Sequence, residues 1–230
     1  MFDGQWRPAV ERAVDPVGVR LHQAGLSANM LTTTGVAASV VAAFFIGRGQ
    51  LGLGCLLLVV AAVPDVLEGA VAMAAGPTWV RGAFYDSTAD RVTDSILVGG
   101  VIWYLIADDR RLLAMVPVAV MAASWLISYQ RAKAESLGLE AKGGIMERAE
   151  RVIVLALALL FSELLIPILW VMLVLTAITA AQRFVKVWRQ ASVDRPVPVR
   201  RQRRQPRARR RGTEPQWRQR MRERRALRDR

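Results

Sequence analysis

Long apolar segments separated by short polar ones make up most of the chain. These segments cover residues 30–47, 51–73, 83–107, 112–136, 149–163 and 165–187. Crossing the hydrocarbon core of a bilayer takes about 20 helical residues, and most of the segments are of that length. A soluble helical domain would need many more polar residues on the outer faces of such segments. The pattern therefore predicts an all-α integral membrane protein with six transmembrane helices.

The segment before the first span, residues 5–24, has a different pattern. Apolar residues recur there every three or four positions, with arginines between them, at Trp6, Val10, Val14, Val17 and Leu21. This periodicity is typical of an amphipathic helix that lies on a membrane surface. A helix packed on the folded body would show the same periodicity, so the pattern leaves both arrangements open.

The charge of the chain is concentrated at its C-terminal end. The whole sequence has a formal net charge of +13, and residues 194–230 contain 16 Arg against 4 acidic residues. Such a segment has too little apolar surface to bury and is predicted to be disordered. We therefore divide the chain into a six-helix transmembrane domain, residues 1–190, and an Arg-rich cytoplasmic tail, residues 191–230.

The composition of the tail also indicates its partner. Each Arg close to an anionic membrane surface contributes about 1 kcal/mol of binding. Binding to nucleic acid is not expected, because Trp217 is the only aromatic residue of the tail that could stack on a base. We expect the tail to bind anionic lipids of the bilayer.

The basic residues of the loops predict the orientation of the spans. Six spans place both termini on the same side, and Arg81 and the basic segment 142–151 fall on that side as well. Loops rich in Lys and Arg remain in the cytoplasm. Both termini are therefore expected to face the cytoplasm.

Five carboxylates lie at the cytoplasmic ends of the second and third spans. Asp65 and Glu68 are three residues apart, and Asp86, Asp90 and Asp94 follow one another at intervals of four. On a helix, these spacings bring side chains to one face. Clustered carboxylates repel one another unless a cation lies between them, so the pattern predicts a divalent metal site. Acids that simply meet water at helix ends are the alternative reading.

This stretch resembles the signature of the CDP-alcohol phosphotransferases, D-x2-D-G-x2-A-R, a spacer, and G-x3-D-x3-D. The matching residues are Asp65, Gly69, Ala72, Gly82, Asp86 and Asp90. Two positions differ, since Glu68 replaces the second Asp and Met73 replaces the Arg. The resemblance implies transfer of a phosphatidyl group from CDP-diacylglycerol to an alcohol, with release of CMP and with two Mg2+ ions, or Mn2+ in their place.

The resemblance also assigns roles to residues. The resemblance implies that the metal ligands are Asp65, Glu68, Asp86 and Asp90. Asp90 would also be the catalytic general base. Those implied to approach the nucleotide are Asn29, Thr32, Asp65, Gly69, Ala72 and Gly82. Helix capping explains Asn29 and Thr32 equally well. Asp94 lies one turn beyond the motif, and no direct chemistry is assigned to it.

A second group of motifs narrows the resemblance to one branch of the family, the phosphatidylinositol phosphate synthases of actinobacteria. The motifs run from Ser128 to Glu135, from Gly143 to Arg151, and over Gln182 and Arg183. The resemblance implies that the phosphate of the acceptor is held by Arg131, Lys133, Arg151 and Arg183. Arg131 and Lys133 each replace the other basic residue type of the branch, which preserves charge but not bidentate geometry.

This branch implies inositol 1-phosphate as the acceptor, while glycerol 3-phosphate and free inositol remain open. It also implies a bacterial cell membrane location and a homodimer. The departures at Glu68 and Met73 support one alternative: a catalytically impaired paralogue that binds lipid or nucleotide, or that partners an active synthase.

Overall fold

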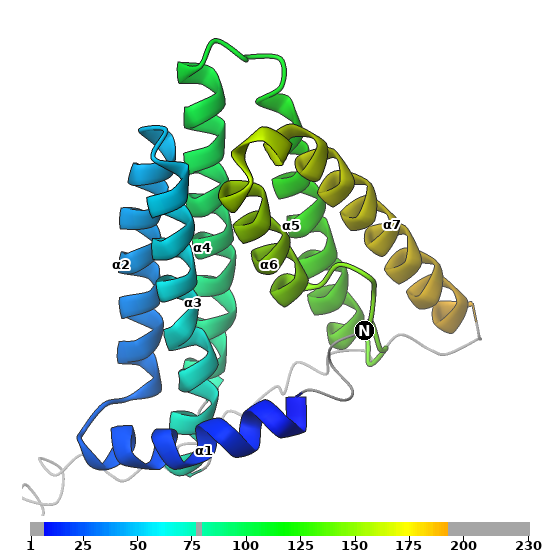
Figure 1. Cartoon of the computed structure of the whole chain (residues 1–230). Coiled ribbons are helices and arrows are strands. Elements are labelled where there is room, and N and C mark those ends of the chain that lie inside the picture. Colours follow the sequence, from blue (N-terminus) through cyan, green and yellow to red (C-terminus); the bar gives the residue numbers. More distant parts are fainter. Residues whose placement is uncertain (1–6, 77–79, 193–230) are drawn as a thin grey trace, which may run out of the picture. The chain divides into compact units, whose positions relative to one another are not determined.

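The computed structural model describes residues 7–76 and 80–192, without the side chains of residues 7–13. Seven α-helices and no strand are present in these ranges (Figure 1). The helices are α1 Arg7–Gln23, α2 Ala28–Gly47, α3 Leu51–Ala74, α4 Val80–Ala107, α5 Met115–Ser136, α6 Arg148–Leu160 and α7 Leu165–Ala191. The predicted all-α class is confirmed. The predicted tail from residue 193 onward, and Trp6 of the predicted surface helix, lie outside the described ranges.

Each predicted span corresponds to one of the helices α2 to α7, with differences at the ends. Helix α5 begins at Met115 rather than at residue 112, because residues 111–114 form a turn. Helix α6 ends at Leu160 rather than at residue 163, since a short 3-10 helix, Ser162–Leu164, connects it to α7.

Three of the described helical segments are long and apolar enough to cross a membrane by themselves. They are Ala28–Gly47, Leu51–Ala74 and Ser162–Ala191. Helix α4 carries several charged residues in its first half, and α6 has only 13 residues. Helices α4, α5 and α6 do not meet this measure, so length and composition show three of the six predicted spans in the described part of the chain.

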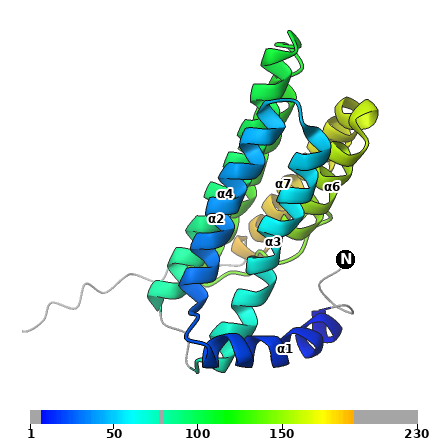
Figure 2. The same ribbon diagram turned by 60° about the vertical axis from the view of Figure 1, so that its left-hand side comes forward.

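The sequence between α1 and α3 fixes two sharp turns. The Ser27 side chain caps α2 by accepting a hydrogen bond from the Met30 backbone N–H at 3.3 Å. Gly25 and Gly49 have φ angles of 86° and 79°, a left-handed conformation that glycine adopts without strain. The short turn at Gly49 folds α3 back alongside α2, and α2 also packs against α4 (Figures 1 and 2).

The helices form two groups, which are joined by α6 and by contacts between α4 and α5. Helix α2 packs against α3 and α4, helix α5 packs against α7, and α6 contacts both α3 and α7. Fully buried side chains at the joint include Leu58 of α3, Leu105 of α4, Leu159 of α6 and Leu169 of α7. This apolar core lies toward the end of the bundle where the α2–α3 turn is found, so the polar residues gather at the opposite end.

Helix α1 lies across that polar end (Figures 1 and 2). Gly18 of α1 is buried directly against Ala70 of α3, with the Ala70 carbonyl oxygen 2.9 Å from where a Cβ would stand. Ala70 follows Glu68 by two residues. The N-terminal helix is therefore attached to the bundle beside the acidic motif.

The close approach of α2 and α4 leads to a stability prediction. A Cβ on Gly100 would lie 2.7 Å from the backbone carbonyl oxygen of Ala43, whereas a Cβ on neighbouring Gly99 meets no atom within 4 Å. Gly100→Ala should push the two helices apart, at a cost of about 1–3 kcal/mol for overpacking. We expect a lower midpoint of thermal unfolding in detergent. Gly99→Ala, the matched control, should leave it unchanged or raise it slightly, because alanine favours the helix; equal effects of the two would contradict the packing described.

Candidate active site

Three of the five carboxylates form a compact group. Asp65 and Glu68 of α3 and Asp86 of α4 each offer an oxygen, and these oxygens lie within 4.8 Å of one another. All three side chains are partly buried. Mg2+ and Mn2+ prefer oxygen ligands of this kind, so the donor set fits a divalent metal ion. The structure thus brings together three of the four predicted metal ligands.

The extra methylene of Glu68 does not carry its carboxylate away from the group. The Thr32 hydroxyl of α2 donates a hydrogen bond of 2.5 Å to Glu68 Oε2. The same hydroxyl lies 3.0 Å from the Ala28 carbonyl oxygen, a longer and competing acceptor. Thr32 is 8% exposed. The structure thus gives Thr32 an orienting contact with Glu68, one of the predicted metal ligands, and its approach to the nucleotide stays a prediction.

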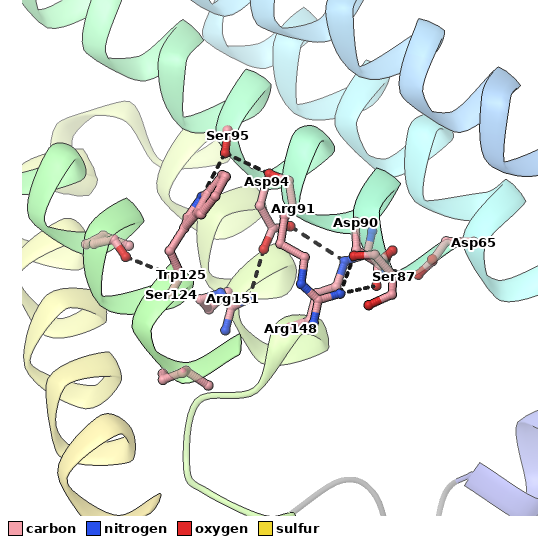
Figure 3. Close-up of polar contacts among 12 residues, drawn as sticks. Asp65, Ser87, Asp90, Arg91, Asp94, Ser95, Ser124, Trp125, Arg148 and Arg151 are labelled. Atoms are coloured by element: carbon pink, nitrogen blue, oxygen red, sulfur yellow. Dashed lines mark hydrogen bonds and ion pairs between the residues drawn. The ribbon is translucent and has the colours of Figure 1, made fainter. Parts of the chain in front are cut away.

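Asp90, the predicted general base, lies beside the group and is connected to it by an arginine. Nη1 of Arg148 is 2.6 Å from Asp65 Oδ2 and 3.0 Å from Asp90 Oδ1 (Figure 3). Arg91 approaches Asp90 from the other side at 3.6 Å. One guanidinium therefore bridges carboxylates of α3 and α4.

Sequence reasoning did not connect Arg148 with the carboxylates of α3 and α4. It is the first residue of α6, just before the apolar segment, and its guanidinium lies against the carboxylates of Asp65 and Asp90. The sequence feature that could have identified Arg148 is its position in the basic segment 142–151. Met73, at the position of the signature arginine, is 59% exposed. The cation that bridges Asp65 and Asp90 therefore comes from α6.

The predicted acceptor arginines are also paired with acids. Nη2 of Arg151 donates to Asp94 at 2.8 Å, and Nη2 of Arg183 donates to Glu147 at 2.6 Å. Both arginine side chains are less than one-tenth exposed. Arg183 thus lies inside the bundle and is paired with a carboxylate.

The remaining two acceptor residues lie on the surface of α5. Arg131 forms an exposed ion pair of 3.0 Å with Glu135, and it lies close enough for its charge to act on Arg183. Lys133 is exposed, and its side chain makes no hydrogen bond or ion pair with the described part of the chain. The structure therefore groups Arg131, Arg151 and Arg183 more closely than it does Lys133.

The predicted nucleotide residues lie on α2, α3 and α4 around the carboxylates. Asn29 Oδ1 is 3.7 Å from the place a Cβ on Gly82 would take, so these two face each other. Gly69 is exposed, and a Cβ there would meet no atom within 4 Å. Ala72 is half-buried one turn further along α3. Small residues thus leave backbone accessible next to the acids.

Comparisons with known proteins agree with these features. A family model for CDP-alcohol phosphatidyltransferase matches residues 26–192. The chain is 33% identical to a phosphatidylinositol phosphate synthase of Streptomyces avermitilis over 84% of each chain. It is 35% identical to an archaetidylinositol phosphate synthase of Methanothermobacter thermautotrophicus, covering 81% of this chain and 94% of the relative.

Solved structures give the same result. The phosphatidylinositol phosphate synthase of Mycobacterium tuberculosis with CDP-DAG bound superposes with a TM-score of 0.74 at 30% identity, over 80% of this chain and 98% of that one. A second structure of the same synthase contains manganese and citrate, with a TM-score of 0.73 over 80% of this chain and 93% of that one. These relatives are synthases, so the comparisons do not favour the impaired-paralogue alternative.

The Thr32–Glu68 hydrogen bond leads to a prediction about metal binding. Thr32→Val keeps the shape of the side chain but leaves Glu68 without its donor. Loss of such an outer-shell partner lowers metal affinity by about tenfold or more. We expect weaker Mn2+ binding by the detergent-solubilised protein, measured by electron paramagnetic resonance of the free ion. Thr34→Val is the control, because the Thr34 hydroxyl bonds the Leu31 carbonyl of its own helix; an equal loss in both variants would refute the role of Thr32.

Proposed function

Because the chain belongs to the CDP-alcohol phosphatidyltransferase family, we propose that it transfers a phosphatidyl group from CDP-diacylglycerol to inositol 1-phosphate. The products are phosphatidylinositol phosphate and CMP. The observation that carries the proposal is the group of Asp65, Glu68 and Asp86 with buried arginines beside it at the same end of the bundle. The relatives named as inositol phosphate synthases support the choice of acceptor.

On the donor side, Asp65, Glu68, Asp86 and Asp90 serve as ligands for two Mg2+ ions, with Mn2+ as the alternative. Divalent ions held there neutralise the diphosphate and the charge that develops on the departing CMP oxygen. The cytidine diphosphate lies against the exposed backbone at Gly69, Ala72 and Gly82. Asn29, which faces Gly82, contacts the nucleotide, and Thr32 acts through Glu68.

On the acceptor side, Arg131, Lys133, Arg151 and Arg183 hold the phosphate of the incoming polyol. Arginine provides several N–H donors, so Arg151 and Arg183 retain donors for phosphate after pairing with Asp94 and Glu147. Asp90 takes the proton from the acceptor hydroxyl while the hydroxyl oxygen attacks the phosphorus that carries diacylglycerol. The bond from that phosphorus to the CMP oxygen then breaks.

Two features of the structure support activity despite the altered signature. Glu68 stays within the carboxylate group because Thr32 holds it, and Arg148 supplies a cation where the signature arginine is missing. Mn2+ tolerates irregular coordination better than Mg2+, which demands near-octahedral geometry. We therefore propose that Mn2+ supports this chain better than Mg2+ does.

The membrane arrangement forms part of the proposal. Helices α2 to α7 cross the bilayer of a bacterial cell, α1 lies at its cytoplasmic surface, and the termini and site face the cytoplasm. The basic residues Arg81 and Arg148 to Arg151 at that end of the helices support this orientation. The Arg-rich tail binds anionic lipids, and two copies of the chain form a homodimer.

The first prediction from this function concerns CMP release by purified protein in detergent with CDP-diacylglycerol. We expect release to require both inositol 1-phosphate and a divalent metal ion. Asp90→Asn should lower the rate by at least about a hundredfold, the usual contribution of a general base. Parallel reactions with glycerol 3-phosphate and with free inositol test the acceptor. Release with free inositol at the same rate would contradict a phosphate-binding role for the arginines.

The second prediction concerns the choice of metal. Glu68→Asp should raise the ratio of the Mg2+-supported rate to the Mn2+-supported rate, since a shorter carboxylate suits regular octahedral coordination. The ratio is measured from initial rates of CMP release at saturating metal. Met73→Arg is the control, because residue 73 points outward and should leave the ratio unchanged. If the natural sequence releases no CMP but the Glu68→Asp/Met73→Arg double variant does, catalysis has been lost in this chain.

A further inference from the structure

Asp94 lies in α4 one turn beyond Asp90, outside the residues that the signature motif uses. Its side chain is 18% exposed. Oδ2 accepts a hydrogen bond of 2.8 Å from Nη2 of Arg151, and Oδ1 lies 3.6 Å from Nε of Arg148 (Figure 3). A single carboxylate therefore contacts two arginines of α6.

The two arginines face different parts of the site. They are three residues apart, so they project from the same side of α6. Arg148 reaches the carboxylates of Asp65 and Asp90. Arg151 makes no ion pair with these two acids in the described part of the chain, and its side chain is 8% exposed. Asp94 lies at the junction between the metal-site carboxylates and the arginines assigned to the acceptor.

Both arginines need a nearby negative charge. A buried cation without a partner is costly, and a guanidinium has five N–H donors to satisfy. Asp94 occupies one donor of Arg151 and leaves others for a ligand. Nε of Arg148 is buried without a hydrogen-bond acceptor, so the charge of Asp94 at 3.6 Å is its compensation at that atom.

We propose that Asp94 is a positioning residue that holds Arg151 for the phosphate of the acceptor and Arg148 beside the metal-site acids. This inference rests on the proposed function, because it assigns acceptor binding to Arg151. Long side chains lose conformational freedom when they bind, and an arginine already fixed by Asp94 loses less. The carboxylate thus prepares the pocket for a phosphorylated polyol.

The direction in which the KM for inositol 1-phosphate changes distinguishes a positioning role of Asp94 from a purely electrostatic one. The negative charge of Asp94 repels a phosphate, so removing that charge would tighten acceptor binding if charge alone mattered. If Asp94 positions Arg151, removing the charge weakens acceptor binding instead. The KM for inositol 1-phosphate therefore moves in opposite directions under the two accounts.

The test compares Asp94→Asn and Asp94→Glu in the full chain. We expect Asp94→Asn to raise the KM for inositol 1-phosphate about tenfold to a hundredfold, the effect of one lost charge-assisted hydrogen bond. The KM for CDP-diacylglycerol should stay within about twofold, and Asp94→Glu should recover most of the loss because it retains the charge. Asp108→Asn is the matched control, since Asp108 pairs with Arg110 at 2.8 Å near the opposite end of α4.

A binding measurement makes the test independent of turnover. Inositol 1-phosphate is titrated into the protein without CDP-diacylglycerol, and the shift in thermal unfolding midpoint gives the affinity. Asp94→Asn should weaken this affinity for inositol 1-phosphate, in parallel with the increase in KM. In a protein that already carries Arg151→Gln, Asp94→Asn should cause little further loss of affinity, because both changes remove the same contact. Asp94→Ser replaces Asp94→Asn if the latter does not fold.

The outcomes distinguish this inference from the proposed function. The role of Asp94 is overturned, and the proposed function is not, if the natural sequence is active and Asp94→Asn leaves the affinity for inositol 1-phosphate unchanged and its KM unchanged or lower. Equal increases in the KM values of both substrates also overturn it, because they indicate a general structural defect. A natural sequence that neither binds nor uses inositol 1-phosphate overturns the proposed function itself.

Discussion

The repulsion among carboxylates gathered at one end of an apolar bundle is the constraint on which the rest of this structure depends. Asp65, Glu68 and Asp86 have oxygens within 4.8 Å of one another, and Asp90 lies next to them. Such a group is stable only with compensating positive charge. A divalent cation provides part of that charge, and Arg148 provides part of it from α6. The ends of α3, α4 and α6 are therefore held together by charge rather than by apolar packing.

Acids and arginines alternate across this end of the bundle. Arg148 lies between Asp65 and Asp94, Asp94 lies between Arg148 and Arg151, and Glu147 pairs with Arg183. Each buried cation is thus compensated, and each retains donors for an anionic ligand. Under the proposed function, a phosphorylated acceptor would meet arginines that are already paired with acids, next to the carboxylate group. Binding and chemistry would then share one network of arginines and acids.

The two departures from the family signature have different physical consequences. Glu68 stays within the carboxylate group, where its longer side chain accepts a hydrogen bond from the Thr32 hydroxyl of another helix. Met73 removes a guanidinium from an exposed position of α3 while Arg148 reaches the acids from α6. One change is corrected by an orienting contact and the other by a cation from elsewhere in the sequence. Neither correction lies within the motif itself.

The sequence by itself determined the helical class, the approximate limits of α2 to α7 and the acids on α3 and α4, because apolar runs and spacings of three and four residues are local properties of a chain. The contacts of Arg148 with Asp65, of Asp94 with Arg151 and of Thr32 with Glu68 join residues that are 36 to 83 positions apart. Only the packing of α2, α3, α4 and α6 decides such pairs, since they depend on how the helices meet and not on the periodicity of any one helix.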